Sequence, residues 1–304
     1  MALSADELAL IERMKADLDA CAVTDERNLR YYLGTQRIEQ LGLAIPPSLR
    51  RFLVIVNWPR VVADTIERRQ NVRSLILPGS PEEDPQLRAI WDGNNLDADL
   101  SLFNLDRLIY GRAYMSVGSN EDDPEIPFMH VESPREVTAR IDVRRRRMEA
   151  ACRFYGEDEN NSWPTNLTLY LPNETIWAEL QAGKWVDVDR DQHNLGRVPM
   201  VLHLNRRRSG SFVGESELSD IIPLTDAAAR ALTNLQFAQE SHGIPRMYMT
   251  GVAQGDFVDK DGNPIPKFEA YFNAIHTLTK ENSKVGQLDA ADLKNFETAV
   301  NLYG

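Results

Sequence analysis

The sequence predicts an α+β fold, and three features of the apolar pattern indicate it. Apolar residues recur at helical spacing in the first part of the chain and again near residues 223–242. Between Phe128 and Leu204 the period changes to two, as in short strands. Turn residues separate these segments. Together they favour a meander of antiparallel strands attached to helices, rather than alternating βαβ units.

Helices are predicted for most of the first 110 residues. An amphipathic helix carries Leu8 to Cys21, and Thr24 is expected to cap a second helix that ends at Gly34. After the Pro46-Pro47 break, an apolar helix anchored by Trp58, Val61, Val62 and Ile66 is expected to be bent or interrupted at Pro59. Two more helices are predicted, from Asp84-Pro85 to about Asn94 and from about Ala98 to Tyr110, where Gly111 stops the second.

Strands follow these helices. Ala113–Val117 alternates, and an acidic loop (residues 119–125, SNEDDPE) comes after it. A turn at residues 181–184 is expected to join the last two strands of the meander as a hairpin. The predicted strands of this region are Glu136–Val143, Met148–Tyr155, Leu167–Leu171, Thr175–Leu180, Trp185–Val188 and Val198–Leu204.

The longest predicted helix runs from Pro223 to His242. Asp220 can cap it, Pro223 suits its first turn, and Gly243 with Pro245 ends it. One face carries Leu224, Ala228, Ala231, Leu235, Ala238 and His242. An alanine-rich face lets another backbone approach closely, so lengthwise packing against a neighbour is one interpretation. The alternative is an ordinary core helix of a monomer.

Composition limits the possible functions. The 304 residues carry a formal net charge of -12, which opposes extensive wrapping of nucleic acid. Cys21 and Cys152 form no CxxC pair, so neither a disulfide framework nor a zinc site is expected. The first residues lack the pattern of a signal peptide, and no run is long and apolar enough for a membrane span. These features predict a soluble protein of the cytoplasm, or of a particle assembled there.

No catalytic signature is found in the sequence. Residues 210–216 resemble a phosphate loop only faintly, because Glu215 stands where lysine is needed. The histidines, His130, His193, His203, His242 and His276, form no metal-binding pair. Asp97 with Asp99, and Asp122 with Asp123, could bind Mg²⁺ only if other oxygens lay near. Helix capping and a solvated loop are the simpler interpretations of these two pairs.

Two basic runs are the clearest electrostatic features, Arg144–Arg147 at the tip of a predicted hairpin and Arg206–Arg208. Neither is interleaved with aromatic residues, so a stacking platform for single-stranded nucleic acid is not predicted. Each run is either a solvated turn or a contact with another subunit or with DNA phosphates. The members are Arg144, Arg145, Arg146, Arg147, Arg206, Arg207 and Arg208.

The order of several segments resembles the portal proteins of tailed bacteriophages, in the subgroup found in phages of actinobacteria. The resemblance begins with YYLGTQRIEQLGLAIPPSLRRF and VNWPRVVADTIERR and continues through WDGNNLDADLSLFNLDRLIYGRAYMSVG. It then covers the strand meander, LGRVPMVLHL and GESELSDIIPLTDAAARALTNL. None of these segments is a catalytic signature, so the resemblance depends on their order along nearly the whole chain.

This resemblance implies a portal-like architecture. Residues 1–205 would form a wing of helices and strands, and residues 206–243 a loop and the first stem helix. Residues 244–285 would form a small clip insertion with turn chemistry at Lys260–Pro264, and residues 286–304 the start of a second stem helix. Family members continue into a tunnel loop and a crown, which the resemblance does not place within these residues.

The resemblance also implies partners. Portal proteins form a ring, usually of twelve subunits, at one capsid vertex, and double-stranded DNA passes through with weak, non-specific contact. The terminase large subunit, a head–tail adaptor, and the major capsid and scaffolding proteins would bind it; no cofactor, metal or membrane is implied. By similarity, the candidates for contact between stem helices are Asp226, Ala228, Arg230, Ala231, Asn234, Leu235, Gln236 and Ala238, and those for clip docking are Arg246, Asp256, Lys260, Asp261 and Lys267.

A rival hypothesis is an enzyme, namely a metal-dependent hydrolase or nuclease that uses Asp97 and Asp99. No nucleophile, base or ligand set has the spacing that such a mechanism needs. We therefore expect no catalysis, and a location in the virion after assembly in the host cytoplasm.

Overall fold

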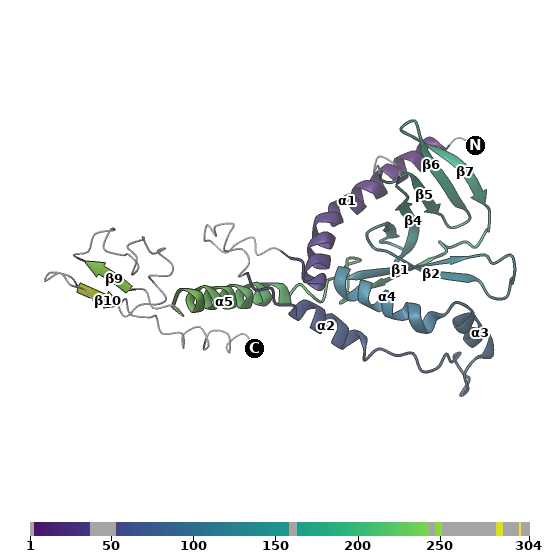
Figure 1. Cartoon of the computed structure of the whole chain (residues 1–304). Coiled ribbons are helices and arrows are strands. Elements are labelled where there is room, and N and C mark those ends of the chain that lie inside the picture. The colour runs from purple at the N-terminus through teal and green to yellow at the C-terminus, as the bar shows by residue number, and fades with distance from the viewer. Residues whose placement is uncertain are drawn as a thin grey trace, which may run out of the picture. The chain divides into compact units, whose positions relative to one another are not determined.

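The computed structural model describes residues 3–36, 53–157, 163–242, 247–250, 284–287 and 298 (Figure 1). The chain divides into two compact units. Unit 1 comprises Met1–Arg37 and Ile55–Thr225, and unit 2 comprises Ile38–Val54 and Asp226–Gly304. Helices and antiparallel sheets both occur, so the predicted α+β class is confirmed.

One long helix, α1 (Ala5–Leu33), opens unit 1. Ser4 and Glu7 form a capping box at its start, and Gly34 ends it in the left-handed conformation with φ 72°. The predicted break at Thr24 is wrong, because the helix continues through it. Beyond that point Asp25 and Asn28 are buried and bonded to other elements, so tertiary contacts hold the helix together there.

Three further helices follow in unit 1: α2 (Trp58–Glu67), α3 (Pro85–Gly93) and α4 (Leu96–Tyr110). The bend or interruption predicted at Pro59 is wrong, since this proline lies in the first turn of α2, where its missing N–H costs nothing. Asp84 accepts a hydrogen bond from Leu87 N and starts α3 as predicted. Gly111, with φ 80°, ends α4 as predicted.

The meander forms a five-stranded antiparallel sheet in the order β3-β4-β5-β6-β7. Its first face packs on α1 in a mainly apolar core that includes Ile11, Met14 and Phe154. The hairpin turn at residues 181–184 is confirmed, with Gln181 paired to Lys184. The strands are β3 (Val137–Asp142), β4 (Arg147–Tyr155), β5 (Asn166–Tyr170), β6 (Thr175–Gln181) and β7 (Lys184–Asp191).

A second, three-stranded sheet has the order β2-β1-β8, with β1 at Arg112–Gly118, β2 at Phe128–Glu132 and β8 at Met200–Leu204. Strand β2 was not predicted. Tyr114 and Met200 of this sheet pack with Val137 and Ala151 from the second face of the larger sheet. Helix α4 contacts β1 and β2, so unit 1 is layered as α1, large sheet, small sheet and α4 (Figure 1).

The longest helix of the sequence pattern is α5 (Ile221–His242), which begins in unit 1 and continues into unit 2. The chain itself buries Ile222, Thr225, Ala228, Ala229 and Thr233. Of the four members of the predicted face whose side chains are described, Ala228 alone belongs to this buried stripe. The two threonines can be buried because their hydroxyls are bonded. Thr225 Oγ1 donates to Ile221 O, and Thr233 Oγ1 accepts from Val54 N in unit 2.

Within unit 2, β9 (Met247–Thr250) pairs antiparallel with β10 (Lys284–Gln287). The other clip residues and nearly all of residues 286–304 lie outside the described residues. The same holds for the Pro46-Pro47 break, the turn at Lys260–Pro264, His276 and the side chains of Ala238 and His242. It also holds for every candidate for clip docking, namely Arg246, Asp256, Lys260, Asp261 and Lys267.

Candidate functional site at the start of helix α5

Two glycines bring the loop before α5 into direct backbone contact with the end of α4. A Cβ atom on Gly214 would lie 1.8 Å from the carbonyl oxygen of Gly111. A Cβ on Gly111 would lie 2.8 Å from the carbonyl carbon of Glu215, and Gly111 also has φ +80°. Only glycine fits at either position without a shift of the backbone. We call this crossing and the hydrogen bonds around it the junction; all of it lies in unit 1.

The last carbonyl groups of α4 find their partners in this loop. Ser216 Oγ donates to Ile109 O at 2.6 Å, and Glu217 N donates to Leu108 O at 2.8 Å. Asn28 Nδ2 of α1 also donates to Ile109 O. The C-terminal carbonyls of a helix have no partner inside the helix, so these bonds satisfy groups that burial would otherwise penalise.

Asn205 is the centre of the junction and is almost fully buried. Its backbone N–H donates to Gly111 O at 2.8 Å, and its amide Nδ2 donates to Glu215 O and to Glu217 Oε2. Arg107 Nη1 donates to Asn205 Oδ1 at 2.8 Å, and Arg107 Nη2 reaches Gln70 just beyond α2. Burial lowers the pKa of Arg107. The junction thus connects α2, α4 and the segment that enters α5.

The run Arg206–Arg208 lies beside this junction and is not a free basic patch throughout. Arg206 binds Glu217 at 2.7 Å and Asp220 at 2.8 Å, and these hydrogen bonds raise its pKa. Arg207 stacks over the Phe212 ring at 4.9 Å, an aromatic contact that sequence spacing did not indicate. Arg208 is exposed. The carboxylate of Asp220, predicted as a helix cap, is engaged by Arg206 immediately before α5.

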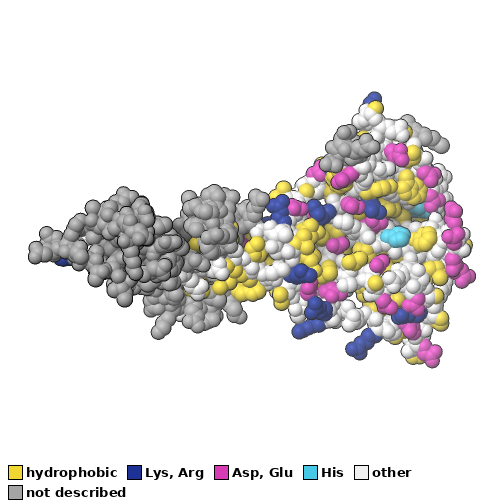
Figure 2. Space-filling view, viewed as in Figure 1, with side chains coloured by type: hydrophobic (Ala, Val, Ile, Leu, Met, Phe, Trp, Pro, Cys, Tyr) yellow, Lys and Arg dark blue, Asp and Glu magenta, His cyan; other side chains and the backbone are white. Residues whose placement is uncertain are grey.

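The run Arg144–Arg147 occupies the tip of the β3–β4 hairpin, as predicted, and all four residues are exposed. Arg145 lies 3.7 Å from Asp142. Among the described residues, Arg144, Arg146 and Arg147 form no ion pair. On the face drawn in Figure 2, acidic side chains line the right-hand edge, and basic side chains lie mainly on the left.

The rival enzyme site is not assembled. Asp97 accepts from Trp91 Nε1 at 2.9 Å, lies 3.5 Å from Arg88, and shares the first turn of α4 with Asp99, where acids favour the helix. Asp122 and Asp123 bond to Asn120 within their exposed loop. In the part of the chain that the structure describes, no three His, Cys, Asp or Glu side chains could hold a metal ion together.

The histidines are dispersed. His130 stacks on Phe128, and His203 packs edge-on against Phe103. Burial, together with Arg107, lowers the pKa of His203. His193 Nδ1 accepts from Leu195 N. None of the described helices is long and apolar enough to cross a bilayer.

The residues that build the junction were not predicted from sequence. Asn205, Ser216 and Arg107 are separated from their partners by up to 108 positions, so no local pattern connects them. The available signals were Gly111 and Gly214, which were interpreted only as a helix stop and a loop residue. Of the candidates on α5, Ala228 is fully buried, whereas Ala231 and Leu235 are partly exposed and Arg230 and Gln236 exposed.

Comparisons with known proteins agree with the sequence resemblance. A family model described as "Phage portal protein, SPP1 Gp6-like" matches residues 13–301. The portal protein of Mycobacterium phage D29 is 33% identical over 281 residues, and that of Mycobacterium phage L5 is 31% identical over the same length. Each alignment covers 90% of this chain and 58% of the relative, so the chain spans under two thirds of their length.

Solved structures add less. A chain from the neck of an empty GTA particle aligns with 87% of this chain, and the alignment includes 68% of the GTA chain. The two are 12% identical, and the TM-score of 0.37 is too low to establish a shared fold. The family match, however, spans both units and includes the junction. On that match and the two mycobacteriophage relatives, the chain belongs to the phage portal proteins of the SPP1 Gp6-like family.

Proposed function

We propose that this chain forms a ring of identical subunits, usually twelve in portal proteins, at one vertex of a tailed-phage capsid. Double-stranded DNA would be packaged and ejected through the ring. The observation that carries the proposal is the family match over residues 13–301.

Within this proposal, residues 1–205 form the wing, and α5 is the first stem helix. Residues 244–285 form the clip, where the terminase large subunit and later the head–tail adaptor dock, and residues 286–304 start the second stem helix. The wing would face the major capsid and scaffolding proteins. The finished location is the virion, after assembly in the host cytoplasm.

The junction gives α5 a role consistent with a stem helix. In this proposal, the Gly111–Gly214 crossing and the Asn205 bonds anchor the first residues of α5 to α4 within the wing. Leu224 is 47% exposed, and Ala231 and Leu235 are only partly buried. We propose this partly exposed face of two leucines and one alanine as the contact with a neighbouring copy, at the usual helix separation of about 8–10 Å.

DNA contact should be weak. The net charge of -12 repels phosphates, so any binding should come from local arginines, ignore sequence and fall steeply with salt. Filter-binding at two salt concentrations measures this. Sequence-selective, salt-resistant binding would contradict a passive channel.

The ring itself is tested by negative-stain imaging and light scattering on the parent chain and on Ala231→Trp. The parent should form rings, and the bulky side chain should block them while circular dichroism stays unchanged, since overpacking costs about 1–3 kcal/mol at each contact. Ala89→Trp on an exposed site of α3 is the matched control and should keep the rings. A parent that stays monomeric at every concentration contradicts the proposal.

A further inference from the structure

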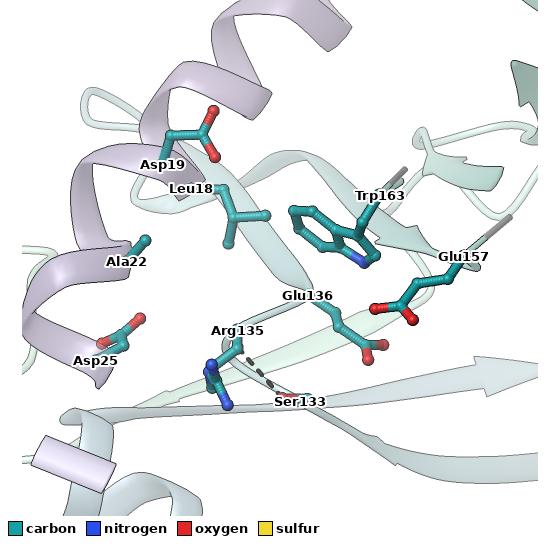
Figure 3. A pocket seen from close by; sticks show the side chains of 9 residues that line it. All are labelled: Leu18, Asp19, Ala22, Asp25, Ser133, Arg135, Glu136, Glu157 and Trp163. Atoms are coloured by element: carbon teal, nitrogen blue, oxygen red, sulfur yellow. Dashed lines mark hydrogen bonds between the residues drawn. The ribbon is translucent and has the colours of Figure 1, made fainter. Parts of the chain in front are cut away.

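A pocket of about 350 Å³ lies between α1 and the start of the β3–β4 hairpin, within unit 1 (Figure 3). Leu18 and Ala22 line it from α1, and Trp163 stands opposite them. Glu136 and Glu157 present their carboxylates below the Trp163 ring. The pocket therefore combines an apolar wall with acidic groups on one side.

The charges of this pocket are not fully balanced by the chain itself. Arg153 is shared between Glu132 and Glu136, at 3.0 and 3.2 Å, so one positive charge serves two carboxylates. Glu157 forms no ion pair among the described residues and is exposed. Asp25 and Asp19, by contrast, are matched by Arg112 and Lys15. Arg135 also lines the pocket and is paired with Glu26 at 2.9 Å. The carboxylate that the described residues leave unpaired is therefore that of Glu157.

Trp163 adds a second preference for cations. The residue is 39% exposed. Lys15, which also binds Asp19, already holds its Nζ 5.0 Å from the ring centre, so an incoming cation would use the remaining exposed part of the ring. An indole face attracts a guanidinium or ammonium group, and it also offers apolar area to a neighbouring side chain. A group that combines an arginine with an aliphatic residue fits both properties.

The tip of the β3–β4 hairpin combines arginines with an aliphatic residue. It carries Val143, which is 70% exposed, followed by the four exposed arginines at 144–147. The pocket lies at the other end of the hairpin, where β3 begins after Glu136. Six residues of β3 at about 3.3 Å each place the tip roughly 20 Å from the pocket, so one copy cannot join its own two ends.

We infer that the Arg144–Arg147 tip of one copy docks in the Trp163–Glu157 pocket of the next copy. The contact uses two different surfaces of each subunit, which is the head-to-tail arrangement that closes a ring of identical chains. The inference rests on the ring proposed above and names one of its contacts in the wing. Because the ion pairs are partly exposed, each should strengthen association only by a factor of about 1.5–5 and weaken with salt.

Cross-linking tests the contact in the whole chain. Cys21→Ser removes the accessible thiol, while Cys152 can stay, because full burial raises its pKa and keeps it unreactive. Arg145→Cys together with Glu157→Cys, treated with a short bismaleimide, should give a ladder of covalent oligomers. Each single-cysteine variant should give none. Gln192→Cys, at an exposed position just beyond β7, replaces Arg145→Cys in the matched control with Glu157→Cys and should also give no ladder.

Charge exchange provides the second measurement. Arg144→Glu with Arg146→Glu should weaken association by about fivefold or more, and adding Glu157→Arg to the same chain should recover part of it. If rings form but neither the cross-linked ladder nor the charge-exchange recovery is seen, the proposed contact is wrong and the ring proposal is unaffected. A parent chain that does not associate overturns both the ring and the contact.

Discussion

The core between α1 and the five-stranded sheet is formed mainly by apolar side chains, among them Ile11, Met14 and Phe154. The junction at the start of α5 is closed instead by a backbone crossing of two glycines and by the bonds of Asn205, Ser216 and Arg107. Both regions lie in unit 1. The first depends on area and volume, so it tolerates similar apolar side chains; the second depends on geometry at single atoms, so it tolerates few substitutions of any kind.

Removing volume from the apolar core should give the largest effect. Phe154 is fully buried, so Phe154→Ala should lower the free energy of unfolding by about 3–5 kcal/mol. Urea denaturation followed by circular dichroism measures the change. Val188→Ala, at a side chain that is 53% exposed, is the control and should lie within about 0.5 kcal/mol of the parent. A Phe154→Ala loss below about 1 kcal/mol would mean that the core is not packed as described.

Adding one methyl group at the junction should cost nearly as much. Gly214→Ala places a Cβ against Gly111 O, so the backbone must move, and we expect a loss of about 2–4 kcal/mol. The matched control is Gly118→Ala, where no atom lies within 4 Å of the new Cβ. Thermal and urea unfolding of both variants give the comparison. Equal stabilities for the two would show that the crossing is looser than the structure has it.

Deleting the central amide of the junction should have a smaller effect. Asn205→Ala removes an acceptor from Arg107 and a donor to Glu217, and leaves both groups partly unpaired, so we expect a loss of about 2 kcal/mol. Gln192→Ala at an exposed position should change little. A neutral Asn205→Ala would mean that water replaces these bonds freely. In that case the contrast between the two regions would be reduced to the glycines.

The smallest effect should appear as a dependence on pH. Burial raises the pKa of Asp106 on α4 from 3.8 to about 7, although nearby Arg112 opposes the shift. The folded state then binds the proton more tightly than the unfolded state, so the free energy of unfolding falls as the pH rises from about 4 to about 7. A shift of this size corresponds to at most about 4 kcal/mol. Because Asp106 is only half-buried and solvent weakens the effect, Asp106→Asn should remove about 1–2 kcal/mol of this dependence. Urea midpoints at pH 4.5 and 7.5 measure it; an unchanged slope would assign the dependence to other groups.

The comparison also explains what the sequence could and could not predict. Alternating apolar residues located the meander, because the strands bury every second side chain, as at Phe154, Leu167 and Ile176. Strand β2 escaped because Phe128 and His130 are exposed while Met129 and Val131 are only half-buried, so its alternation is weak. The break expected at Thr24 failed because Asp25 and Asn28, polar in the pattern, are buried and paired.

The junction could not be found in this way. Its partners come from α2, α4 and the loop before α5, and hydrogen bonds between distant polar residues leave no periodic trace. For the same reason the buried stripe of α5 includes Thr225 and Thr233, whose hydroxyls are satisfied and therefore tolerate burial. The resemblance to portal proteins came from the order of sequence segments, which reflects common descent and not the physical chemistry of any one segment. Contacts between stem helices at Asp226, Arg230, Asn234 and Gln236 stay predictions.

The contact of α1 with β7, the last strand of the five-stranded sheet, has a consequence for synthesis of the chain. Glu7 at the first turn of α1 binds Arg190 on β7 at 2.9 Å, although 183 positions separate them. A ribosome adding about 5–20 residues per second needs on the order of ten seconds or more to reach Arg190. Until then the apolar stripe of α1, with Ile11, Met14 and Leu18, has no finished sheet to cover it. Until β7 has been synthesised, the nascent chain therefore carries an amphipathic helix whose apolar face lacks its complete partner sheet.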